Sequence, residues 1–207
     1  MDPREIRVIR GKGAGFNMLR KTSAVIVGMV VAAGAAAHGQ QRLYPPAVPD
    51  NLVVSSDYKL TLAGHAVGTQ NYICAVTPAG VVDWLFIGPQ ATVFDTDGRQ
   101  IMTHFLSKNP WDADALQATW QHSGDTSAAW AVRVDGATVD PTAIDWLLLD
   151  VRGSQPGPSG GDKLDDTQFI QRVHTVGGLK PPTSECTASK LTTRRNVYYE
   201  ADYYFYK

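Results

Sequence analysis

The stretch QFIQRVHTVGGLKPPTSEC, residues Gln168–Cys186, decides the fold. It combines a predicted β-strand, the double glycine Gly177–Gly178, a double proline and one of only two cysteines in the chain. Glycine lets the backbone turn where a side chain would clash, so we expect the strand to end in a turn. On that strand Gln171 and Arg172 point to opposite faces, so at most one of them faces any given pocket.

The two cysteines of the chain are Cys74 and Cys186. In an exported protein such a pair most simply forms one disulfide, which would tie the turn after the strand to a distant segment. The alternative is two reduced thiols in a cytosolic protein, and it requires the export signal described below to be false.

Outward from this stretch, short apolar runs recur at roughly 8–12-residue spacing, separated by turns rich in Gly, Pro and Asp. Beyond the N-terminal region no segment keeps a 3.6-residue apolar period. The pattern predicts a single all-β domain over residues 58–207, an antiparallel β-sandwich or a barrel-like domain with long loops. The predicted strands are 68–76, 81–88, 91–95, 99–106, 118–122, 128–134, 143–152, a strand from Gln168 and 196–206.

The N-terminal region separates into three parts. We interpret residues 1–17 as a mis-assigned extension, with translation starting at Met18; a genuine long basic region is the alternative. Residues 18–39 combine basic residues, an apolar run and small residues before a cleavage site, the layout of a secretory signal peptide. Residues 40–57 follow as an extended, proline-rich lead-in. The sequence therefore predicts export, to the periplasm or outside the cell, with no membrane span in the mature chain.

A set of short motifs is spread over most of the predicted domain: Gly68–Gln70, Tyr72, Cys74, Pro89, Ala91, His104, Trp146–Leu149, Ile170–Arg172, Thr175, Gly177, Gly178, Cys186, Ala201–Tyr203, Phe205 and Tyr206. Together these residues resemble a family of exported proteins known as domain of unknown function 3455. Two positions depart from its pattern: Asp145 stands where proline is expected and His174 where asparagine is expected, which argues against a family-wide catalytic role for His174. The resemblance implies export and one compact domain, and it implies no activity.

Aromatic and acidic side chains suggest a ligand-binding surface. On the last predicted strand one face carries tyrosines beside carboxylates, a composition suited to sugars because rings stack on apolar faces and carboxylates accept hydroxyl hydrogen bonds. Two tryptophans are candidates for the same surface; the alternative is that most of these rings belong to the core. The candidate residues are Tyr198, Tyr204, Tyr206, Trp120, Trp130, Glu200 and Asp202.

Histidines suggest a second possibility. His104, His65 and His174 would form a transition-metal site if they converge in space, although no local zinc motif is present. No cofactor is predicted otherwise.

The net charge of the predicted mature chain argues against nucleic acid and anionic membranes as partners. Without residues 1–37 the chain keeps 13 basic and 18 acidic residues, a net charge of −5. Such a chain has no electrostatic footprint for nucleic acid and no polybasic patch for membranes. The alternation of aromatic and acidic residues and the lack of a catalytic motif lead us to expect a non-enzymatic, envelope-associated domain that binds a ligand such as a carbohydrate or cell-surface polymer. A metal-binding protein or metal-dependent enzyme that uses His104 is the alternative, and a purely structural component is a third class.

Overall fold

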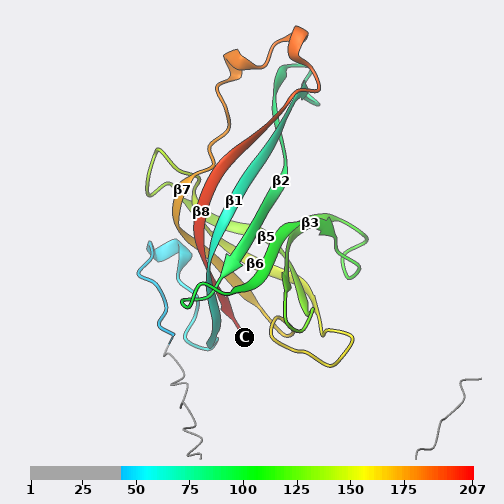
Figure 1. Cartoon of the computed structure of the whole chain (residues 1–207). Helices are drawn as coiled ribbons and strands as arrows, with labels where there is room; N and C mark the ends of the chain where they lie inside the picture. The colour runs from blue at the N-terminus through cyan, green and yellow to red at the C-terminus, as the bar shows by residue number, and fades with distance from the viewer. Residues whose placement is uncertain (1–42) are drawn as a thin grey trace, which may run out of the picture. The chain divides into compact units, whose positions relative to one another are not determined.

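Eight antiparallel strands close into a barrel in which each strand pairs with the next and β8 pairs with β1 (Figure 1). The structure is a computed structural model that describes residues 43–207. The predicted extension and signal peptide lie outside the described residues. The strands are β1 (Leu60–Val76), β2 (Val82–Phe94), β3 (Gln100–Lys108), β4 (Leu116–His122), β5 (Ala128–Ala137), β6 (Trp146–Gln155), β7 (Phe169–Gly177) and β8 (Arg194–Tyr206). Three short 3₁₀ turns complete the elements: η1 (Asp50–Leu52), η2 (Thr183–Glu185) and η3 (Ala188–Lys190).

The all-β prediction is confirmed, and the closed sheet decides between the two predicted architectures in favour of a barrel. Within residues 43–207, no helix is of the length and apolarity that crossing a membrane requires.

Two strand boundaries differ from the prediction. β1 begins at Leu60, eight residues before the predicted start, and pairs along most of its length with β8. β2 continues through Gly88–Pro89, where a break was predicted. The ladder between β1 and β2 shifts register at Asn71 and Tyr72, and Gly88 takes a positive φ of 125° that favours glycine. A bulge therefore accommodates the Gly-Pro pair that a regular strand would exclude.

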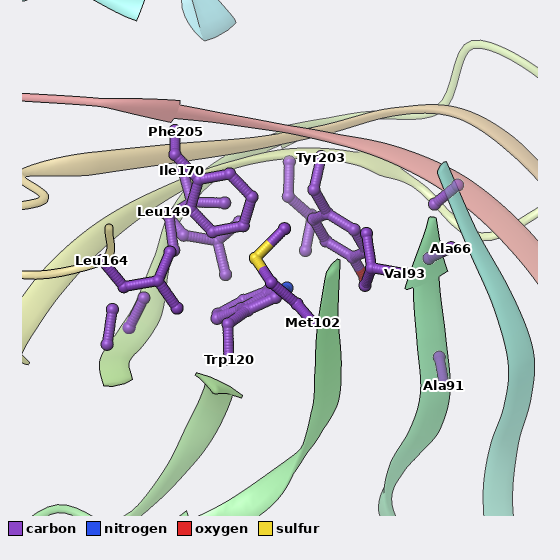
Figure 2. Close-up of a cluster of buried hydrophobic side chains, with 14 of the residues drawn as sticks. Ala66, Ala91, Val93, Met102, Trp120, Leu149, Leu164, Ile170, Tyr203 and Phe205 are labelled. Atoms are coloured by element: carbon purple, nitrogen blue, oxygen red, sulfur yellow. The ribbon is translucent and has the colours of Figure 1, made fainter. Parts of the chain in front are cut away.

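One end of the barrel is filled by apolar side chains. Trp120, Met102 and Phe205 point toward one another in the interior (Figure 2), and Leu164 from the loop between β6 and β7 is fully buried against them. Ala66 and Ala91 keep the β1–β2 wall thin, which leaves space for the large rings. The core thus lies inside the barrel and closes this end.

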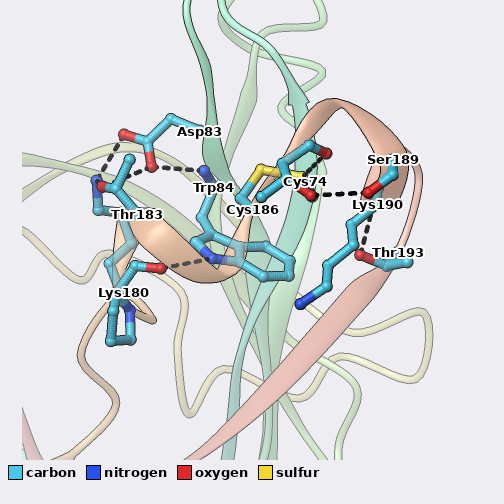
Figure 3. Close-up of a disulfide and its surroundings, with 11 residues drawn as sticks. Cys74, Asp83, Trp84, Lys180, Thr183, Cys186, Ser189, Lys190 and Thr193 are labelled. Carbon is cyan, nitrogen blue, oxygen red and sulfur yellow. Dashed lines mark hydrogen bonds and ion pairs between the residues drawn. A yellow bond between two sulfur atoms is a disulfide. The ribbon is translucent and has the colours of Figure 1, made fainter.

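The long strands β1, β2 and β8 extend beyond the barrel and carry a second, small core at their tip (Figures 1 and 3). The predicted disulfide is present there: Cys74 and Cys186 are bonded, with their Cα atoms 5.4 Å apart. The two cysteines pack against Trp84 and Tyr72. The Trp84 indole Nε1 donates a hydrogen bond to the Pro182 carbonyl at 3.2 Å. The disulfide therefore holds the segment between β7 and β8 onto the β1–β2 hairpin.

The Gln168–Cys186 stretch contains β7 and the turn after it, as the sequence indicates. Gly177 and Gly178 both have positive φ, 61° and 78°. A Cβ on Gly177 would lie 2.7 Å from the Tyr198 carbonyl oxygen, so a side chain is excluded there. Arg172 faces the barrel interior, whereas Gln171 lies outside and donates to the Leu52 carbonyl of the lead-in at 2.6 Å.

Candidate functional site

The other end of the barrel holds a cavity of about 300 Å³. It lies where β3 leads into β4 and β5 leads into β6. Trp120, Leu147, Leu149 and Tyr203 belong both to the core and to the cavity wall, so the core forms its floor. The wall is completed by Gln70, Phe86, Pro89, His104, Leu106, Leu116, Gln117, Ala118, Ala131, Val132, Arg133 and Arg172.

Two buried hydrogen-bond donors in this wall have no partner. Gln70 is 4% exposed and Trp120 is 0% exposed. Gln70 Nε2 and Trp120 Nε1 are the only buried side-chain polar atoms of residues 43–207 that form no hydrogen bond. An unpaired buried donor costs about 1–3 kcal/mol, and native proteins hold few of them. Both donors belong to residues that line the same cavity.

The imidazole ring of His104 forms part of the cavity wall, and its hydrogen bond fixes its tautomer. Its ring stacks on Trp120 with centroids 4.1 Å apart, and its Nδ1–H donates to the Thr119 carbonyl at 2.9 Å. Burial lowers the pKa of His104 to about 3; the hydrogen bond to Thr119 opposes this shift and the charge of Arg172 adds to it. The ring is therefore neutral near pH 7, and Nε2 is left as an acceptor.

His104 should make stability depend on pH. In the unfolded chain its pKa returns to 6.5, so between pH 6.5 and 3 only the unfolded state binds the proton. Stability should be complete above pH 6.5 and fall on acidification, by up to about 1.4 kcal/mol per pH unit from this residue. Urea unfolding at pH 7, 6 and 5 should give a shallower pH slope for His104→Phe than for the wild type. Parallel pH profiles for the two proteins would contradict this.

Arg172 brings a positive charge to the cavity without a neutralising carboxylate. Its Nε and Nη2 donate to the Asp145 carbonyl oxygen at 3.2 and 2.8 Å. Within residues 43–207 it forms no ion pair, whereas Arg133 at the rim pairs with the Asp145 carboxylate at 3.3 Å. Burial raises the pKa of Tyr203, and the charge of Arg172 opposes that shift. The guanidinium is thus held in place by a neutral carbonyl and lies beside the Tyr203 hydroxyl, and it has no carboxylate partner within residues 43–207.

The barrel wall has a short seam beside the cavity. β2 pairs with β3 only from Ala91 to Phe94, so the rest of β3 pairs with β4 alone. An outer groove of about 720 Å³ runs along this seam. Pro89, His104 and Leu106 line both the groove and the inner cavity. The seam is therefore a thin wall between the cavity and the outer surface.

The predicted aromatic surface does not exist as one surface. The strand does alternate as expected: Tyr198, Glu200, Asp202 and Tyr204 lie on the outer face of β8. Tyr198 is 53% exposed and its hydroxyl donates to Glu200.

The other candidate rings are buried in separate places. Trp120 lies inside the barrel, and Trp130 is buried on the outer side of β5, with its Nε1 donating to Ser107 Oγ at 2.8 Å. Tyr206 is buried and donates to Gln171 at 2.6 Å. These rings therefore do not form one surface, because the barrel wall separates Trp120 from the outer rings, and Trp130 and Tyr206 are buried.

The three histidines do not converge either. His104 faces the interior, whereas His65 and His174 lie outside and share Asp202, with Nδ1–carboxylate distances of 2.8 and 2.9 Å. His65 also contacts Glu200 at 3.2 Å. In the described part of the chain no group of three His, Cys, Asp or Glu side chains is placed to hold a metal ion. The three histidines therefore do not form one cluster, because the barrel wall separates His104 from His65 and His174.

Gln70 and Arg172 were not among the predicted binding residues. A signal for each was present: Gln70 is in phase with Tyr72 and Cys74 in an alternating strand, and Arg172 was one of two neighbours of which one could face a pocket. The alternation does not tell which polar residue meets an open space inside the barrel.

Comparison with known proteins bears on the family alone. No curated protein and no solved structure matches the chain significantly. The family model described as "Protein of unknown function (DUF3455)" matches residues 54–207, which covers all eight strands. The chain belongs to the DUF3455 family of proteins of unknown function.

Proposed function

We propose that the protein is a non-enzymatic binding protein that holds one small organic molecule in the cavity of its barrel. The observation that carries the proposal is the pair of unpartnered, buried donors, Gln70 Nε2 and Trp120 Nε1, in the wall of one cavity. A volume of about 300 Å³ is at the lower end of the range for ligand pockets. Eight-stranded barrels are wide enough to hold one small ligand.

The lining fits a partly apolar ligand. Aliphatic and aromatic side chains such as Leu147, Leu149, Phe86 and Tyr203 make up most of the wall, and a few polar groups stand among them. This is the usual composition of a small-molecule site, in which apolar contacts supply affinity and the polar groups fix orientation.

A carbohydrate polymer on the outer face of β8 is less well supported. Only Tyr198 presents a well-exposed ring there, and its hydroxyl already donates to Glu200. Sugar-binding surfaces need rings whose faces are free to stack, and one exposed ring gives a short platform.

We also propose that the domain acts outside the cytosol. The Cys74–Cys186 disulfide supports this, because disulfides persist in oxidising compartments. The layout of residues 18–39 supports it independently, because it matches a secretory signal peptide.

Titration with the neutral fluorescent probe N-phenyl-1-naphthylamine tests the binding function. The probe should bind the wild type at one site. Ala131→Leu places extra atoms in the cavity wall and should weaken binding about tenfold or more, since one lost apolar contact of about 1.4 kcal/mol has that effect. Ala79→Leu makes the same change in the exposed β1–β2 turn and should leave binding unchanged.

If Ala131→Leu fails to fold, Leu106→Trp fills the cavity from its half-buried rim. Equal probe binding by the wild type and a folded, cavity-filled variant would overturn the proposal, as would no binding at all.

A further inference from the structure

The cavity wall holds unpartnered hydrogen-bond donors together with a positive charge. Gln70 Nε2 and Trp120 Nε1 are unpartnered, and Arg172 carries a charge that no carboxylate within residues 43–207 neutralises. His104 Nε2 is the one acceptor that the neutral ring adds. A neutral apolar molecule would leave the two buried donors unpaired, and a cationic one would be repelled by the guanidinium.

We propose that the ligand is a small organic anion, with one carboxylate that binds Arg172 and an apolar body that packs beside Trp120. This inference rests on the proposed binding function and names the class of ligand. A carboxylate is acceptor-only when ionised and has two oxygens, so it can accept from the guanidinium and from a neighbouring donor together.

The surroundings of Arg172 suit an anion. The guanidinium is positioned by two hydrogen bonds to one carbonyl oxygen, that of Asp145, and therefore keeps its full charge. It faces a cavity whose floor is apolar, where a charge-assisted hydrogen bond is stronger than in water. Arg133 lines the same cavity at the rim, but its charge is offset by the Asp145 carboxylate and more than half of its side chain is exposed. The two arginines thus provide a matched pair for a test.

The test is displacement of bound N-phenyl-1-naphthylamine by 1-naphthoate and by its neutral isostere 1-naphthamide at pH 7. Wild-type protein should bind the naphthoate about tenfold or more tightly than the amide, the range that a charge-assisted hydrogen bond supplies. Arg172→Met should abolish this preference while the amide and the reporter bind as before. Arg133→Met should keep most of the preference.

Gln70→Leu provides a second test of the anion inference, and this test does not depend on whether Arg172→Met folds. It removes an unpartnered buried donor, so the free protein should be at least as stable as the wild type while naphthoate binding weakens. A lower stability with unchanged naphthoate binding would contradict the role of Gln70.

The outcomes separate the two proposals. If the reporter does not bind, the binding function fails and the ligand class fails with it. If the reporter binds and both competitors displace it equally, or if neither displaces it, the anion inference alone is overturned. If the naphthoate preference survives in Arg172→Met, the assignment to Arg172 is overturned.

Discussion

Reduction of the Cys74–Cys186 disulfide is expected to lower the free energy of unfolding by about 4–5 kcal/mol. The two cysteines are 112 residues apart in sequence. In the chain-entropy account, a cross-link that closes so long a loop removes many conformations from the unfolded chain, and its loss restores them. The change is a large fraction of the total stability of a typical domain.

The surroundings of the disulfide add a local reason for the same result. Cys74 exchanges backbone hydrogen bonds with Thr192 and Thr193, and Cys186 packs with it against Trp84 (Figure 3). The tip has few other apolar contacts, so the segment that contains η2 and η3 should loosen first.

Urea unfolding of oxidised protein, fully reduced protein and a Cys74→Ala, Cys186→Ala double variant measures this effect. The reduced protein and the double variant should both unfold at a much lower urea concentration than the oxidised protein. An unchanged urea midpoint under full reduction would show that the disulfide contributes nothing to stability.

Trp120→Ala is expected to cost about 3–5 kcal/mol, as buried tryptophan truncations do. Trp120 is fully buried and contacts His104, Tyr203 and Phe205, with ring centroids 4.1, 5.2 and 6.0 Å away. Its removal would merge the core with the cavity above it, and the ring pairs would be lost along with the buried area.

Trp111→Ala is the matched control, because Trp111 is 64% exposed in the loop between β3 and β4. It should change stability by less than about 1 kcal/mol. Equal losses from the two substitutions in urea unfolding would contradict the interior position of Trp120.

The fold could be predicted from local patterns where those patterns repeat along one strand. β8 alternates apolar and polar residues, so both of its faces could be assigned before the structure was known. The turn after β7 could be predicted because Gly177 and Gly178 favour a turn. The disulfide could be predicted because the chain has only two cysteines. The first half of β1 escaped prediction because two of its inward positions, Gly64 and Ala66, are small and give a weak apolar signal.

The site was less predictable because it depends on contacts between distant strands. Gln70 and Arg172 come to line one cavity only after β8 closes the barrel between β1 and β7. The residues that cover an outer face are equally non-local: the lead-in residue Leu52 accepts a hydrogen bond from Gln171, which in turn accepts one from Tyr206. An alternating pattern tells inward from outward, and it does not tell which inward residues meet an open space.

The indole Nε1–H signal of Trp120, followed by ¹⁵N–¹H NMR during titration with N-phenyl-1-naphthylamine, shows whether the probe binds in the barrel cavity. Trp120→Phe assigns the signal. The Nε1 atoms of Trp84 and Trp130 already have partners, and Trp111 is exposed on the surface. If the barrel cavity is the binding site, the Trp120 signal should shift and saturate at one equivalent of probe. A Trp120 signal that stays in place while the Trp111 signal shifts would place binding on the outer surface and contradict the account.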